Sequence, residues 1–134
     1  SYLSGSKKNW LINHSDWLFP IAHPFWASKF SPQHAIEWIV VRYDYLTSSS
    51  GKQVTLKEAG LPTQGTHDIN ESTQLEFFRL LDGTGLAFYH FEAFNQPWKK
   101  YAQKHQEVEA HWGLYDLNGK PKKIISWLKT RWKK

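Results

Sequence analysis

The chain has 134 residues, of which 40% are hydrophobic and 16% aromatic, and its formal net charge is +5. This length fits one domain with its own core, which we place at residues 1–134. The absence of cysteine excludes a disulfide framework and a thiolate metal site, and no apolar run approaches the length that spans a membrane.

The first predicted strand lies in the apolar run WLFPIAHPFW, residues 17–26. Continuous apolar character predicts a strand covered on both faces, as in a parallel sheet, with Pro20 at a bulge or a strand margin. Ser31 and Pro32 then predict a helix start, because Ser is a good N-cap and Pro suits the first helical position. The polar run 47–51 is expected to end this helix.

A second strand is predicted around residues 53–58, followed by a loop over 59–69. Asn70 is expected to cap the next helix, because its side chain can accept hydrogen bonds from the first turn. Gly83 and Gly85 are expected to end that helix, since glycine is common just beyond a helix C-terminus.

The third predicted strand is the ring-rich segment LAFYHFEAF, residues 86–94. A long loop over 95–111, a turn at 118–119 and a last helix over roughly 121–132 complete the chain. The alternation of strand and helix predicts an α/β fold with parallel strands and right-handed crossovers.

The positive charge is concentrated near the C-terminal end. Most of these residues fall on the predicted terminal helix, where lysine usually marks a solvated face, and we therefore expect no nucleic-acid partner. A nucleic-acid-binding domain remains the alternative, and it would bind DNA or RNA with a strong dependence on salt. The residues concerned are Lys120, Lys122, Lys123, Lys129, Arg131, Lys133 and Lys134.

The carboxyl ends of the three predicted strands carry candidate site residues. In parallel α/β folds the ligand binds at that end of the strands. The first strand leaves His23, Phe25 and Trp26 there, the second leaves Glu58, and the third leaves Glu92. Two carboxylates among aromatic rings suit glycoside hydrolysis, in which one is the acid and the other the nucleophile or base.

Each candidate also has a structural interpretation. Glu58 could cap a backbone N–H or pair with Lys57 or Lys99, and His23 could be a hydrogen-bonded structural histidine. Glu92 lies inside an apolar strand, so it needs a partner such as His23 or Lys99. We expect no metal, because no ligand spacing such as HExxH occurs, and no cofactor, because glycine-rich phosphate-binding motifs are missing.

Three blocks of sequence carry a family resemblance. The segment KEAGLPTQG, residues 57–65, follows IAHPFW, residues 21–26, and precedes FEAFNQPWKK, residues 91–100, with EAHWGLYDLNGKPK, residues 109–122. Their content and order resemble glycoside hydrolase family 17, the β-1,3-glucanases and related transglycosylases. The similarity extends from about residue 17 to the end of the chain.

The resemblance implies a partial (β/α)8 TIM barrel, with this chain holding the last three β/α units and forming the C-terminal half. It implies that Glu58 is the nucleophile of a retaining enzyme that acts on a β-1,3-glucan-type polysaccharide. The family's acid/base lies on the fourth strand, and no matching segment occurs here. We therefore expect weak activity, or none, from this chain alone.

The resemblance also implies a set of substrate-binding residues. Lys99 and Glu109 match charged neighbours of the family's site, and Phe91, Trp98 and Trp112 match aromatic or apolar positions near the sugar subsites. The full expected set is His23, Phe25, Trp26, Phe91, Glu92, Trp98, Lys99, Glu109 and Trp112.

The expected partner is a β-glucan or an oligosaccharide. A non-catalytic carbohydrate-binding remnant and a glucan transglycosylase are the alternative functions. Three parallel strands would expose apolar edges, so we also expect either the missing N-terminal half of the barrel or self-association to cover them. A signal on the full-length protein would place it outside the cell, in the periplasm or in the cell envelope.

Overall fold

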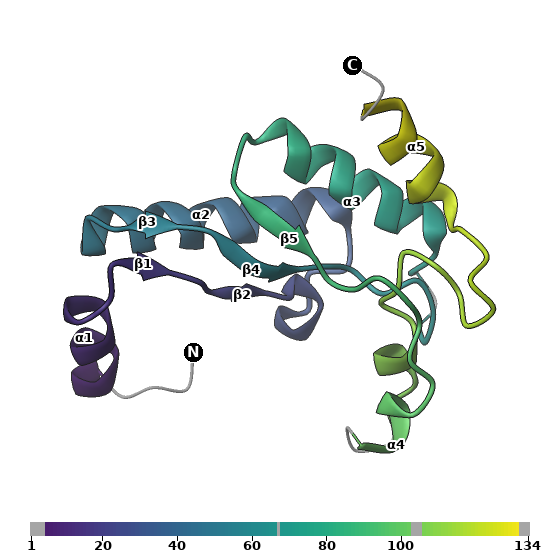
Figure 1. The fold of residues 1–134 in the computed structure, drawn as a ribbon, viewed down its shortest axis with the longest axis horizontal. Helices are drawn as coiled ribbons and strands as arrows, with labels where there is room; N and C mark the ends of the chain where they lie inside the picture. The colour runs from purple at the N-terminus through teal and green to yellow at the C-terminus, as the bar shows by residue number, and fades with distance from the viewer. Residues whose placement is uncertain (1–4, 67, 103–105, 132–134) are drawn as a thin grey trace.

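The computed structural model describes residues 5–66, 68–102 and 106–131 (Figure 1). Among these residues, no helix is both long and apolar enough to cross a membrane. The elements in chain order are α1 (Gly5–Asn13), β1 (Trp17–Leu18), β2 (Ile21–Ala22), η1 (Pro24–Ala27), α2 (Pro32–Ser50), β3 (Gln53–Val54), β4 (Leu56–Ala59), α3 (Glu71–Gly83), β5 (Phe88–His90), α4 (Lys99–Ala102), η2 (Glu107–Ala110) and α5 (Lys123–Arg131).

The described strands form two parallel sheets. Strand β1 pairs with β3, while β4 lies between β2 and β5 in a sheet of order β2-β4-β5. The register places Ile21 beside Glu58 and Ala22 beside Ala59, and Ala59 in turn beside His90. Helices separate the paired strands along the chain, so the predicted α/β fold with parallel strands is confirmed.

The predicted strand over 17–26 is broken in two. Pro20 separates β1 from β2 because it has no N–H to donate, although its carbonyl accepts a 2.9 Å hydrogen bond from Lys57 N. Pro20 thus lies at a strand margin, as predicted. The prediction of cover on both faces is wrong for this chain, since Trp17, Phe19 and Ile21 are 52%, 52% and 55% exposed.

The later elements differ from prediction mainly in length. The third strand is confined to β5, because the chain beyond His90 leaves the sheet and Phe94 forms an isolated bridge with Tyr115. The expected loop over 95–111 contains two short helices, α4 and η2, within its described part.

The caps of the two longest helices follow the sequence signals. The Ser31 side chain accepts a hydrogen bond from His34 N, and the chain leaves α2 through Gly51 at a φ of 65°. Asn70 and Thr73 form a capping box at the start of α3. The predicted starts of both helices are therefore confirmed. They were predictable because each cap depends on residues close together in the chain.

The helices α2 and α3 lie side by side along one face of the strands (Figure 1). Ala22, Leu56 and Ala59 point from the strands into a core that also contains Ile39 and Phe78. Successive side chains of a regular strand point to opposite faces, and the register irregularity between Leu56 and Ala59 lets both of these side chains point into the core. The face that α2 and α3 leave uncovered therefore presents the exposed side chains Trp17, Phe19, Ile21, Lys57 and Tyr89.

Candidate functional site

Glu58 stands near the carboxyl end of β4, the middle strand of its sheet. Its side chain is 24% exposed, and Lys57 Nζ lies 3.2 Å from Glu58 Oε1. His23 Nε2, contributed by the end of the neighbouring strand, lies 3.6 Å from Glu58 Oε2. The carboxylate is thus paired with Lys57, lies close to His23 and still reaches the surface.

His23 is a neutral contact of Glu58. Burial lowers the pKa of His23 to about 4, the nearby Glu58 carboxylate opposes that shift, and Lys99 adds slightly to it. At neutral pH the imidazole therefore carries no charge, and its 3.6 Å distance from Glu58 is longer than a hydrogen bond. His23 also packs on rings, with centroids 4.7 Å from Phe91 and 4.8 Å from Trp112.

Glu92 forms a second carboxylate centre after β5. Lys99 Nζ donates to Glu92 Oε2 at 2.6 Å, and Gln96 Nε2 donates to the same oxygen. The predicted need for a partner is confirmed, and of the two candidates Lys99 makes the ion pair. Lys99 also lies over the ring of Phe91, 4.7 Å from its centroid, which connects this centre to His23.

Glu109 lies on η2, on the same side of the site as Lys99. Burial raises the pKa of the Glu109 carboxyl; Lys99 opposes the shift and Glu92 adds to it. The charges of these three residues are therefore coupled, although they come from separate segments. A chain of contacts connects the three carboxylates. His23 lies beside Glu58 and packs on Phe91. Lys99 lies over Phe91, pairs with Glu92 and acts on the charge of Glu109.

The aromatic candidates divide into buried and exposed rings. Trp112 is 0% exposed and packs beneath Phe25 and Phe91, with centroid separations of 6.2 and 5.7 Å. Trp26 and Trp98 are 46% and 60% exposed. Trp26 and Trp98 can therefore offer a ring to a ligand, whereas Trp112 forms the floor below the site.

The turn behind Glu58 depends on Gly60. A Cβ at this position would lie 2.3 Å from the carbonyl oxygen of Phe91, closer than packed atoms come. Phe91 N donates to the Ala59 carbonyl at 2.8 Å, so the ends of β4 and β5 approach backbone to backbone here. Glycine lets the loop after Glu58 pass directly beside the segment that carries Glu92.

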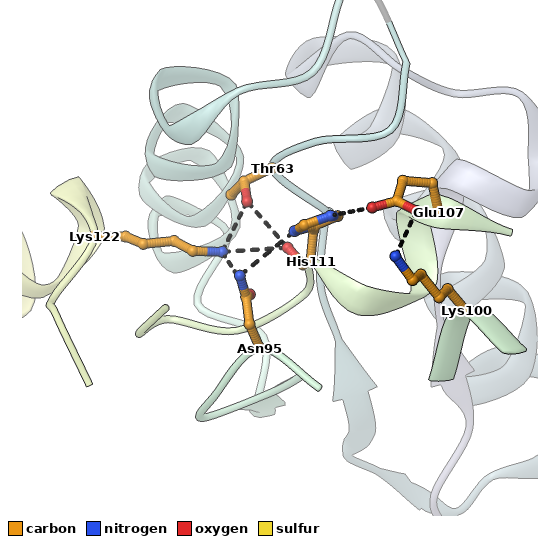
Figure 2. Close-up of polar contacts among 6 residues, drawn as sticks. All are labelled: Thr63, Asn95, Lys100, Glu107, His111 and Lys122. Carbon is orange, nitrogen blue, oxygen red and sulfur yellow. Dashed lines mark hydrogen bonds and ion pairs between the residues drawn. The ribbon is translucent and has the colours of Figure 1, made fainter. Parts of the chain in front are cut away.

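The sequence reasoning missed a buried lysine. Lys122 precedes α5, is only 4% exposed and is not on the solvated face predicted for the terminal lysines. Its ammonium donates to Thr63, Asn95 and the His111 carbonyl, as Figure 2 shows. Composition contains no sign of this burial, because the contacts join distant parts of the chain.

Comparison with curated proteins finds fungal relatives that are named as glucosidases. A probable glucan endo-1,3-beta-glucosidase of Aspergillus terreus is 30% identical over 81% of this chain and 20% of its own length. A probable family 17 glucosidase of Saccharomyces cerevisiae is 26% identical over 78% of this chain and 28% of its own length. The chain thus spans a small part of each relative. No protein-family profile matches it.

Solved structures share the fold. A glycoside hydrolase family 17 beta-1,3-glucanosyltransferase from Rhizomucor miehei matches with a TM-score of 0.71 and 21% identity, over 85% of this chain and 44% of that one. An active-site mutant of the Rhizomucor miehei enzyme, in complex with laminaritriose, matches with the same TM-score, 20% identity and the same coverage. The resemblance to glycoside hydrolase family 17 is therefore confirmed, over part of the length of these relatives.

Proposed function

We propose that this relative of glycoside hydrolase family 17 forms the last three β/α units of a (β/α)8 barrel that acts on β-1,3-glucan, with Glu58 as the nucleophile. The observation that carries the proposal is the placement of Glu58. It lies at the carboxyl end of the middle parallel strand, where ligands bind in such folds, and beside a neutral imidazole, while the neighbouring strand β5 leads into the ion-paired Glu92.

The uncovered face of the sheet supports the assignment to a larger barrel. Large apolar side chains there are half exposed, and in a closed barrel such side chains fill the interior. The chain also covers only 44% of the solved structure that it matches. The preceding β/α units would cover this face and bring the acid/base carboxyl opposite Glu58.

The proposed reaction is a double displacement. The Glu58 carboxylate attacks the anomeric carbon and forms a glycosyl ester, while the leaving oxygen takes a proton from the acid/base carboxyl of the preceding β/α units, ~5–5.5 Å away in retaining enzymes. That carboxylate then removes a proton from water, or from a sugar hydroxyl, which attacks the ester and frees Glu58. Water yields hydrolysis, and a sugar hydroxyl yields transglycosylation.

The remaining site residues suit sugar binding. The exposed rings of Trp26 and Trp98 can stack on the apolar faces of glucosyl units. Glu92 and Lys99 present charged hydrogen-bonding groups, and Glu109 adds a carboxyl whose pKa is raised by burial. Phe91 and Trp112 support them from below.

The test is covalent labelling of the native protein that contains this sequence. A 2-fluoro glucosyl donor with an activated leaving group needs little acid assistance, so it reports on the nucleophile alone. We expect a stable adduct by intact mass, mapped by peptide digestion to Glu58 and absent in Glu58→Gln. Glu37→Gln, an exposed carboxylate on α2, is the matched control and should label like the native protein.

The outcomes separate the candidate functions. A folded protein that forms no adduct at Glu58 contradicts the proposal, and retention on insoluble β-1,3-glucan would then identify a binding module. With an adduct present, chromatography of the products from a laminari-oligosaccharide distinguishes hydrolysis from transfer, because only transfer makes products longer than the substrate.

A further inference from the structure

We propose that Lys122 is a positioning residue that holds together the three segments on which Glu58, Glu92 and Glu109 lie. The inference rests on the proposed function, because it assigns Lys122 to the geometry of the same site. Nothing in the motifs that resemble family 17 gives this lysine a role.

The contacts of Lys122 reach all three segments (Figure 2). Its Nζ donates to Thr63 Oγ1 at 2.7 Å, to Asn95 Oδ1 at 2.9 Å and to the His111 carbonyl at 3.2 Å. Each acceptor lies a few residues beyond one carboxylate in the chain. Thr63 is in the loop that leads from Glu58, and Asn95 is in the segment that leads from Glu92. His111 directly follows η2, the short helix that carries Glu109. One ammonium group therefore joins the three carboxylate-bearing segments behind the site.

Weaker links continue from this centre to the helix that begins with Lys99. Asn95 Nδ2 lies 3.5 Å from His111 Nδ1, and His111 Nε2 lies 3.1 Å from Glu107 Oε1. Glu107 Oε2 in turn lies 3.4 Å from Lys100 Nζ on α4. The network thus extends from Lys122 towards the cation that holds Glu92.

Two of the Lys122 acceptors also have other donors. The His111 carbonyl accepts from Thr63 N and Thr63 Oγ1, each at 3.0 Å, and Asn95 Oδ1 accepts from Gly113 N at 3.1 Å. Removal of the lysine therefore leaves these buried oxygens paired. We expect the fold to survive the loss of Lys122 while the distances among the three segments become less sharply defined.

The ammonium is bound by neutral oxygens, which makes it sensitive to pH. Burial lowers the pKa of Lys122 to about 8. Three carboxylates oppose the shift, those of Glu71 on α3, of Asp116 in the turn that precedes Lys122, and of Glu92. Above that pH the neutral amine has two N–H groups in place of three. It can then no longer donate to all three acceptors.

This deprotonation does not by itself unfold the protein. The folded pKa is lower than the unfolded value of 10.5, so the unfolded chain binds more protons between about 8 and 10.5. The contribution of Lys122 to stability therefore rises with pH in this window, whereas its positioning effect falls. The two effects have opposite signs and can be measured separately.

The test is the rate of Glu58 labelling by the activated 2-fluoro donor across neutral to alkaline pH. We expect the native rate to fall as pH rises through about 8 while circular dichroism stays constant. Lys122→Met should label about 10-fold more slowly at neutral pH, since small misplacements of reacting groups are costly, and should lack that fall. Lys120→Met, in the exposed turn nearby, is the matched control and should follow the native profile.

Hydrogen exchange supplies a readout that needs no activity. Lys122→Met should exchange faster than the native protein over residues 59–65, 91–96 and 109–113 together, with residues of α2 unchanged. The inference is overturned if Lys122→Met exchanges like the native protein, or if the labelling rate of the native protein does not fall near the pKa of Lys122. Either result leaves Glu58 as the nucleophile. Absence of labelling in the native protein overturns the proposed function, and the exchange comparison then decides the role of Lys122.

Discussion

Lys99 Nζ lies 2.6 Å from Glu92 Oε2, and the two side chains are only 16% and 10% exposed. This ion pair joins the segment after β5 to α4, and its cation also lies over the ring of Phe91. Gln96 donates to the same carboxylate oxygen, which further compensates the cost of burying the charge.

Lys99→Met is expected to destabilise the protein by about 3 kcal/mol, because it leaves the Glu92 carboxylate buried without its cation. The double variant Lys99→Met with Glu92→Gln should recover part of that loss, since no unpaired charge remains. Urea unfolding of both variants measures the difference. Lys100→Met is the matched control, because its partner Glu107 is 55% exposed, and it should leave the stability nearly unchanged.

Gly60→Ala should destabilise the protein by about 1–3 kcal/mol, because the new Cβ would overlap the Phe91 carbonyl and force the two strand ends apart. The same displacement should slow labelling of Glu58. Gly83→Ala is the control, since a Cβ at the end of α3 meets nothing within 4 Å. Equal stability of the two alanine variants would refute the close approach between Gly60 and Phe91.

Acid should weaken the fold through His23. Its folded pKa of about 4 lies below the usual 6.5, so the unfolded chain takes up a proton that the folded chain excludes. Stability is therefore lost as pH falls from about 6.5 towards 4, by about 3 kcal/mol for this residue. The free energy of unfolding of His23→Gln should depend less steeply on pH over that range, and an unchanged slope would contradict the assignment.

The two tryptophans Trp98 and Trp112 should respond differently to truncation. Trp112→Ala removes a fully buried ring and is expected to cost about 3–5 kcal/mol, so its thermal midpoint should fall sharply. Trp98→Ala removes an exposed ring and should leave the midpoint nearly unchanged while raising KM for laminari-oligosaccharides about 10-fold. A Trp98 variant with native KM would remove that ring from the proposed subsites.

Signals between chain neighbours were readable from the sequence. Ser31 followed by Pro32 marked the start of α2, and Asn70 marked the start of α3, because a cap satisfies backbone groups within one turn. Alternating strand and helix patterns indicated parallel strands, since such strands need a crossover between them. The motif blocks indicated a resemblance to family 17, and the relatives confirmed that resemblance.

Strand length and cover were less predictable. Apolar character predicted one strand over 17–26 covered on both faces, but Pro20, which has no N–H to donate, divides it into β1 and β2, and Trp17, Phe19 and Ile21 are about half exposed. A run of apolar side chains indicates that a strand face is suited to burial. It does not indicate which segment packs against that face.

The sequence by itself determined the parallel α/β pattern, the starts of α2 and α3 and the position of Glu58 at a strand end. Only the tertiary structure decided that Lys99 pairs with Glu92, that Trp112 is buried, and that Lys122 joins three loops. The physical reason is range. Caps and periodicity act across one or two turns of backbone, whereas burial and ion pairing depend on which distant segments the packed core brings together.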